Sequence, residues 1–160
     1  LVTKSSIWTI KDMKAFNYFL SILFTFLAIN NFAYAKNEIS LKEFLDEKNI
    51  ESEKTQIYLL QRCSSIYAFA SGVLMKSDSL QSKKLIEISN NLLFKSVELM
   101  VIEEQKSLEV SQKHSEDIRK KLFNNYIADG KQNWERNKSY FKGSYIENDM
   151  IICSKLTEDK

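Results

Sequence analysis

Residues 59–73, LLQRCSSIYAFASGV, lie at the centre of a segment whose apolar side chains recur every three or four positions. This spacing is that of one face of an α-helix. Two apolar stripes lie side by side, one through Ile57, Leu60, Cys63, Tyr67, Ala70 and Leu74, the other through Leu59, Ile66, Phe69 and Val73. A helix that is apolar over so wide an arc is typical of the centre of a bundle. The pattern predicts a central helix from about Ser52 to Lys76.

The composition points to helices throughout the chain. It contains no proline and three glycines in 160 residues, whereas β-rich folds use turn residues densely. Ser40 and Glu43 match a capping box at the start of a short helix. Asp78 is expected to cap a helix from Ser79 to about Lys113. These patterns predict an all-α fold, a small bundle of about five helices.

The boundaries in the second half are less sharply marked. Ser115 either caps a fourth helix or lies within a continuation of the third helix to Ile127, and Gly130 is expected to end whichever helix reaches it. A last helix is expected from Tyr145 to Leu156, with its apolar side on Ile146, Met150 and Cys153.

The N-terminal region has the features of a secretory signal. Residues 13–35 begin with Met13 and Lys14, continue as an apolar run, and end in Ala33-Tyr34-Ala35, the order of a signal peptide. The run is shorter than the roughly 20 residues of a membrane span, so cleavage after Ala35 is expected, with a retained anchor as the alternative. We expect residues 1–12 to be an over-long gene start, or a genuine extension, and residues 36–160 to form a single domain.

Charge argues against a nucleic-acid partner. Three basic residues and one acidic residue precede Lys36, so residues 36–160 carry 20 of each sign. A nucleic-acid-binding domain usually has a clustered basic patch. We therefore expect no nucleic-acid partner, and no stable membrane span once the signal is cleaved.

The chain has two cysteines, Cys63 and Cys153, both on predicted apolar helix faces. In an oxidising compartment two cysteines usually form a disulfide, so we expect a bond that closes the bundle in a bacterial periplasmic or secreted protein. In the chain-entropy model a bridge over a loop of about 90 residues stabilises by roughly 4 to 5 kcal/mol. Two buried free thiols are the main alternative, and no Cys-x-x-Cys motif supports a redox role.

The sequence contains no recognisable catalytic or metal-binding constellation. His114 is the only histidine, too few for a zinc site, so no metal and no cofactor are expected. No Gly-rich phosphate loop or nucleophile elbow is present. Asp149, among apolar residues, is expected to cap the last helix or to pair with a lysine. Enzymatic activity is uncertain and disfavoured; an enzyme without a visible motif stays open.

Two sets of residues are candidates for binding. Ser64, Ala68 and Gly72 recur every four residues along one edge of the central helix; close helix packing is the favoured interpretation and a ligand groove the alternative. The second set is aromatic and lies among lysines and arginines, a mixture common in binding hot spots, although packing at a corner of the bundle also explains it: Tyr126, Trp134, Tyr140, Phe141 and Tyr145. The chain is therefore expected to be a non-enzymatic module that binds an unknown protein partner, or alternatively a carrier of an apolar small molecule between helices.

Overall fold

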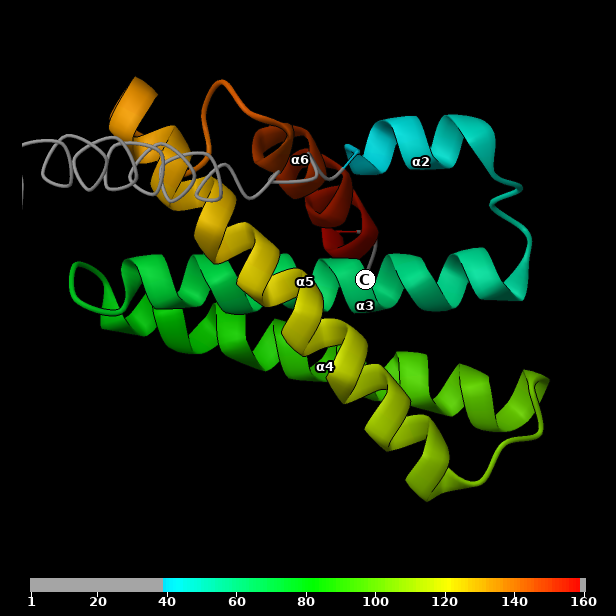
Figure 1. Ribbon diagram of the computed structural model, residues 1–160. Coiled ribbons are helices and arrows are strands. Elements are labelled where there is room, and N and C mark those ends of the chain that lie inside the picture. The colour runs from blue at the N-terminus through cyan, green and yellow to red at the C-terminus, as the bar shows by residue number, and fades with distance from the viewer. Residues whose placement is uncertain (1–38, 159–160) are drawn as a thin grey trace, which may run out of the picture. The chain divides into compact units, whose positions relative to one another are not determined.

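The computed structural model describes residues 39–158, which form five α-helices (Figure 1). They are α2 (Leu41–Glu47), α3 (Glu53–Leu74), α4 (Ser79–Glu103), α5 (Leu108–Asn137) and α6 (Tyr145–Glu158). The predicted all-α bundle, closed by a disulfide, is confirmed. The expected gene extension and signal peptide, and the first residues of the expected 36–160 domain, lie outside the described residues. Among the described helices, none is long and apolar enough to cross a membrane.

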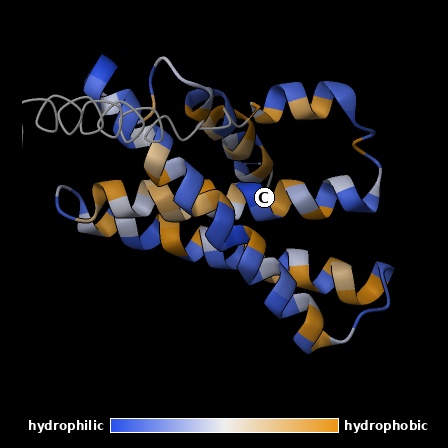
Figure 2. Ribbon diagram, in the orientation of Figure 1, coloured by the Kyte–Doolittle hydropathy of each residue, from blue (hydrophilic) through white to orange (hydrophobic). Residues whose placement is uncertain are grey.

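α3 is the central helix of the bundle. It packs against α4, α5 and α6, and α6 in turn packs against α2. α4 runs antiparallel beside α3, and α5 crosses both obliquely (Figure 1). Hydrophobic and hydrophilic residues alternate along the helices (Figure 2), as amphipathic helices around one core require. Residues 59–73 are apolar over a broad arc because three helices pack around this part of α3.

Two predicted helix starts are found with their expected caps. The Ser40 side chain accepts a hydrogen bond from the Glu43 N–H at 3.1 Å, and Glu43 Oε2 accepts one from the Ser40 N–H at 2.8 Å. Asp78 Oδ1 accepts from the Gln81 N–H at 2.9 Å. Each cap satisfies backbone donors that the first turn of a helix leaves free.

The predicted extent of the third helix is wrong. α4 ends at Glu103 rather than near Lys113, because Gln105 takes a left-handed conformation with φ 52°. Ser107 then caps α5, accepting a hydrogen bond from the Val110 N–H. The polar stretch after Glu103 is therefore a turn and a new helix start.

Ser115 and Gly130 do not mark helix boundaries either, since α5 runs without a break to Asn137. Gly130 lies within α5 where the Phe69 ring packs onto the backbone: a Cβ there would lie 2.5 Å from Phe69 Cζ. The helix ends instead at Lys138, with φ 55°, whose N–H donates to the Trp134 carbonyl. Glycine is used here for close packing and not for a turn.

Serines join α3 to α4. Ser64 Oγ donates to the Ser89 carbonyl at 2.8 Å, and Ser89 Oγ donates back to the Ser64 carbonyl at 2.7 Å. Ser71 and Ser82 repeat this exchange at 2.9 Å in both directions. The two pairs are seven residues apart on each helix, so they lie on one antiparallel seam. Because serine is small, the two backbones approach closely along it.

Candidate functional site

A groove of about 750 Å³ lies between the C-terminal half of α3, the start of α4 and the middle of α5. Ala68 and Gly72 of α3 line it, and we call these two residues its floor; its surface is mainly apolar. Gly72 leaves open space, since apart from its chain neighbours and the backbone of its own helix no atom lies within 4 Å of the position where its Cβ would be. Three further apolar side chains line the groove, Met75, Ile86 and Phe123.

The groove follows from the packing on either side of it. Ser71 and Ser82 hold α3 and α4 together at its base, and their hydroxyls are engaged with each other's backbone carbonyls. On the α5 side, the Ser65 hydroxyl donates to the Gln61 carbonyl of its own helix at 2.7 Å and also lies 3.2 Å from the Arg119 carbonyl of α5. The helices therefore stay fixed while the small residues of α3 leave space between them. The base carries few polar groups that are free to bind water.

Charged residues of α4 and α5 also line the groove, and we call them its rim. Lys83 of α4 and Arg119 and Lys120 of α5 contribute three cations, and Glu116 one carboxylate. In the described part of the chain no ion pair joins any of these cations to an acidic side chain. Arg119 Nη1 donates instead to Asn90 Oδ1 at 3.1 Å. The rim thus has a positive excess over an apolar floor, an arrangement that can hold an anionic group beside an apolar one.

Each of the two interpretations of the small-residue edge, Ser64, Ala68 and Gly72, holds for part of it. Ser64 is fully buried in the α3–α4 seam, as close helix packing requires. Ala68 and Gly72 line the groove. The seven-residue spacing of Ser82 and Ser89 in α4, which sequence reasoning missed, was the signal that could have located the seam.

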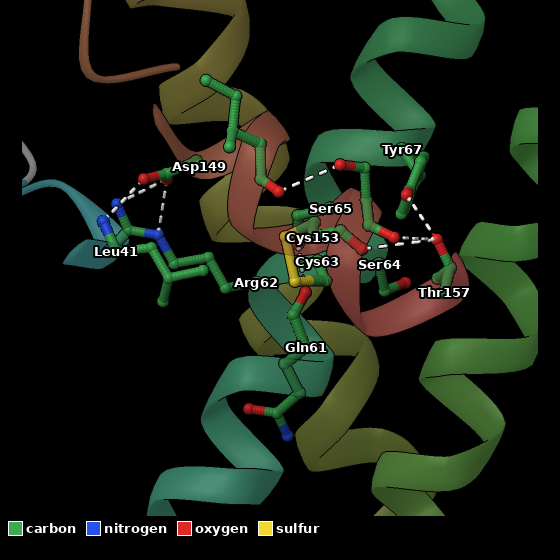
Figure 3. The surroundings of a disulfide bond; sticks show 12 residues. Leu41, Gln61, Arg62, Cys63, Ser64, Ser65, Tyr67, Asp149, Cys153 and Thr157 are labelled. Atoms are coloured by element: carbon green, nitrogen blue, oxygen red, sulfur yellow. Dashed lines mark hydrogen bonds and ion pairs between the residues drawn. A yellow bond between two sulfur atoms is a disulfide. The ribbon is translucent and has the colours of Figure 1, made fainter. Parts of the chain in front are cut away.

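The predicted disulfide joins α3 to α6 (Figure 3). Cys63 and Cys153 are bonded, with their Cα atoms 5.3 Å apart, and both are fully buried. The bridge lies beside a buried ion pair between Arg62 and Asp149, which come from the same two helices. The groove and this covalent link therefore share the central helix but occupy different parts of it.

Asp149 receives hydrogen bonds from three elements. Arg62 Nε donates to its Oδ2 at 2.8 Å, Tyr126 OH donates to the same oxygen at 2.7 Å, and the Leu41 N–H donates to Oδ1 at 2.6 Å. The expectation that Asp149 caps the last helix or pairs with a lysine is therefore wrong: it pairs with Arg62 and accepts from the start of α2. A signal was available, because a bond between Cys63 and Cys153 brings Arg62 and Asp149 close together.

Burial and the neighbouring groups shift the pKa values of Asp149, Arg62 and Tyr126. Burial raises the pKa of Asp149, although Arg62 and the hydrogen bonds from Leu41 and Tyr126 act in the opposite direction. Burial opposes the charge on Arg62, but Tyr126 and Asp149 outweigh it, so the pKa of Arg62 is raised. Burial also raises the pKa of Tyr126 well above its usual value. Arg62 and Asp149 have no exposed surface, so the cluster connects helices and does not face a substrate.

The five predicted aromatic residues do not form one surface. Tyr126 is 1% exposed, so it belongs to the core and not to a binding face. Phe141 packs on the Phe69 ring, and Tyr145 stacks on Tyr126 while its hydroxyl donates to Asp129. Trp134 is 45% exposed and stacks on Tyr140 with ring centroids 4.9 Å apart. Trp134 is thus the exposed member of the set, and the half-buried Tyr140 beneath it also packs edge-on against the Phe69 ring.

Other chemistry has little support in the described residues. Between residues 39 and 158, no three histidine, cysteine or acidic side chains come together in a way that could hold a metal ion. His114 is exposed on α5. No family model, curated protein or solved structure matches the chain. A functional proposal therefore depends on the groove and the surface themselves.

Proposed function

We propose that this protein binds and carries a small amphiphile, with its apolar body in the groove over Ala68 and Gly72 and its anionic head group at the rim. The observation that carries the proposal is an apolar groove of about 750 Å³ beneath a rim with a positive excess. Small-molecule sites typically occupy about 300 to 1,000 Å³ and combine apolar walls with a few polar groups. A long-chain carboxylate is the simplest ligand of this kind.

The apolar body and the head group have different roles. Each methylene removed from water contributes about 0.8 kcal/mol, so the alkyl chain supplies most of the affinity. Ion pairs with exposed lysines contribute about 0 to 1 kcal/mol each. Lys83, Arg119 and Lys120 therefore select the sign of the head group and orient the ligand, while the floor of the groove holds its chain.

Calorimetric titration of the purified, disulfide-bonded protein with dodecanoate tests this function. Gly72→Leu places a side chain in the open space of the groove, so affinity should fall at least tenfold. Gly72→Ala is the matched control, since it makes the same backbone change with a much smaller side chain and should keep most of the affinity. Dodecyltrimethylammonium should bind more weakly than dodecanoate. Equal affinity for both ligands, or full binding to Gly72→Leu, would contradict the proposal.

A second candidate is binding of a protein partner through Trp134 and Tyr140. It is supported by the exposure of Trp134 and its stacking on Tyr140, since exposed tryptophan and tyrosine are common in binding hot spots. If this pair carries the function, Trp134→Ala should abolish capture of the natural partner without changing dodecanoate binding.

We also infer that the protein works after export, in a bacterial periplasm or outside the cell. The Cys63–Cys153 bond supports this, because such bonds persist mainly in oxidising compartments. The sequence of residues 13–35 supplies the expected signal. Intact mass of the protein recovered from its host tests the inference: cleavage after Ala35 is expected, and a retained N-terminus with two free thiols would contradict it.

A further inference from the structure

The outer face of α4 carries three large exposed side chains, Leu80, Phe94 and Ile102, each more than 60% exposed. Figure 2 shows hydrophobic segments on the part of α4 that leads into the turn before α5. The three residues belong to a stripe that advances by three or four positions, through 80, 84, 87, 91, 94, 98 and 102. Such spacing keeps residues on one side of a helix. We call this stripe the outer α4 face; the buried residues of α4, such as Leu85 and Leu92, lie on the other side.

The charged residues on and beside this face are arranged so that an antiparallel second copy would bring opposite charges together. Lys84 and Glu98 lie equally far from Asn91 in opposite directions along the helix, and so do Glu87 and Lys95. In the described part of the chain none of the four charged groups has an ion-pair partner. If a second α4 ran antiparallel with Asn91 beside Asn91, each lysine would therefore lie at the height of a glutamate of the other copy.

The apolar residues follow the same symmetry. Ile88 and Phe94 lie equally far from Asn91, and Leu80 and Ile102 are also equidistant from it. The antiparallel pairing that brings opposite charges to the same height thus also brings apolar residues to the same height as apolar residues. A two-fold interface requires this property, since each patch must complement itself.

A hollow beside the outer α4 face can receive a side chain. A second groove, of about 560 Å³, is lined by Leu60, Ile88 and Leu92 on one part and by Leu156 of α6 on another. Phe94 itself lines this groove and is 68% exposed. Asn91 lines it as well, so an antiparallel pairing centred on Asn91 turns the two grooves and the two Phe94 side chains towards each other.

We propose that two copies of this chain associate through the outer α4 face, antiparallel about a two-fold axis at Asn91, with Lys84 and Lys95 of each copy at the height of Glu98 and Glu87 of the other and with both Phe94 side chains buried in the interface. This inference does not depend on the amphiphile groove, since none of the residues that line that groove belongs to the outer α4 face. The partner is a second copy of this chain because an antiparallel α4 matches each of these lysines with a glutamate.

Sedimentation velocity over a range of protein concentrations measures the association. The wild-type protein should change from monomer to dimer with rising concentration. Phe94→Asp should weaken the dimer at least tenfold, and Lys84→Glu should weaken it because like charges then meet. Lys84→Glu combined with Glu98→Lys should restore association. Lys113→Glu on α5 is the control for net charge and should leave the dimer unchanged.

A cysteine at the proposed axis gives a second, independent readout. Asn91→Cys places the same thiol of both copies side by side, so mild oxidation with oxidised glutathione should give a covalent dimer. Glu109→Cys, exposed on α5, should give little. A wild-type protein that stays monomeric, an unaffected Phe94→Asp dimer, a double charge reversal without recovery, or no covalent dimer from Asn91→Cys would each overturn the proposal.

Discussion

Arg62 and Asp149 show how single residues hold this fold together. The pair is fully buried, which costs free energy unless every polar group is satisfied. Arg62 also donates to the hydroxyls of Tyr58 and Tyr126 and to the Ile39 carbonyl. These bonds join the segment before α2 to α3, α5 and α6. We therefore regard the cluster as a connection between helices.

Arg62→Met should lower the free energy of unfolding by about 3 to 5 kcal/mol at pH 7, because it leaves the Asp149 carboxylate buried without its cation. The pKa of Asp149 should then rise further, since Arg62 lowers it in the native protein. In the variant, folded Asp149 would bind a proton more tightly than in the unfolded chain, so part of the lost stability should return as the pH falls from 7 towards about 4.

Urea unfolding at both pH values measures the effect of Arg62→Met. Arg136→Met removes an exposed arginine and is the matched control, with an expected change within about 0.5 kcal/mol. A loss below 1 kcal/mol in Arg62→Met would show that the buried pair does not connect the helices as described.

Two helical glycines should respond in opposite directions to the same substitution. Gly72→Ala adds a methyl group to open space, so it should stabilise by about 0.5 to 1 kcal/mol through helix propensity and the unfolded state. Gly130→Ala forces a Cβ against the buried Phe69 ring, and overpacking of about 1 to 3 kcal/mol should exceed that gain. Thermal unfolding of both variants should give melting temperatures on opposite sides of the wild type. Two shifts of the same sign would contradict the packing described at one of the two glycines.

At the scale of elements, the serine seam fixes the distance between α3 and α4. Ser64 and Ser89 exchange hydrogen bonds with each other's carbonyls and have no exposed surface. Their small size is as important as their hydroxyls, because a larger residue would separate the helices. The seam thereby also fixes the base of the amphiphile groove.

Ser89→Leu should therefore destabilise more than Ser89→Ala. Alanine removes one hydrogen bond, worth about 1 kcal/mol, and leaves the helix spacing intact. Leucine adds volume at a filled contact and should cost about 1 to 3 kcal/mol more. Chemical denaturation of both variants compares them, and Lys113→Leu on the exposed face of α5 controls for the added leucine. An equally stable Ser89→Leu would show that the seam is not tightly packed.

Helix starts were predictable from the sequence because a cap depends on neighbouring residues, as at Ser40 and Asp78. The end of α4 was missed because Gln105 adopts a left-handed backbone that its residue type does not require. The role of Gly130 was missed because it depends on Phe69, in another helix. Local signals thus predicted local structure, and contacts between distant residues decided the rest.

The same distinction applies to the candidate site. The partners Cys63 and Cys153 were predictable because the chain has two cysteines on apolar faces. The groove was foreseen only as an alternative, since Ala68 and Gly72 favour close packing and open space equally well by residue type. Its rim combines residues of α4 and α5 whose proximity depends on how α5 crosses the other helices.

At the scale of the whole molecule, one disulfide spans 90 residues and joins the central helix to the last one. Replacing both cysteines by alanine should lower the free energy of unfolding by about 4 kcal/mol, mainly because the unfolded chain gains freedom. The amphiphile groove lies on α3, α4 and α5, away from the bridge, so dodecanoate should still bind the folded variant. Urea unfolding and calorimetry on the same sample check both expectations. Lost binding in a folded variant would show that α6 contributes to the groove.

The most direct test of the central claim is where the amphiphile binds. Titration of isotopically labelled protein with dodecanoate, followed by backbone amide NMR, locates the site residue by residue. We predict the largest shifts at Ala68, Gly72, Ile86 and Phe123, with little change at Trp134 or Phe94. Shifts centred on Trp134 and Tyr140, or none at concentrations where dodecanoate is monomeric, would contradict the account.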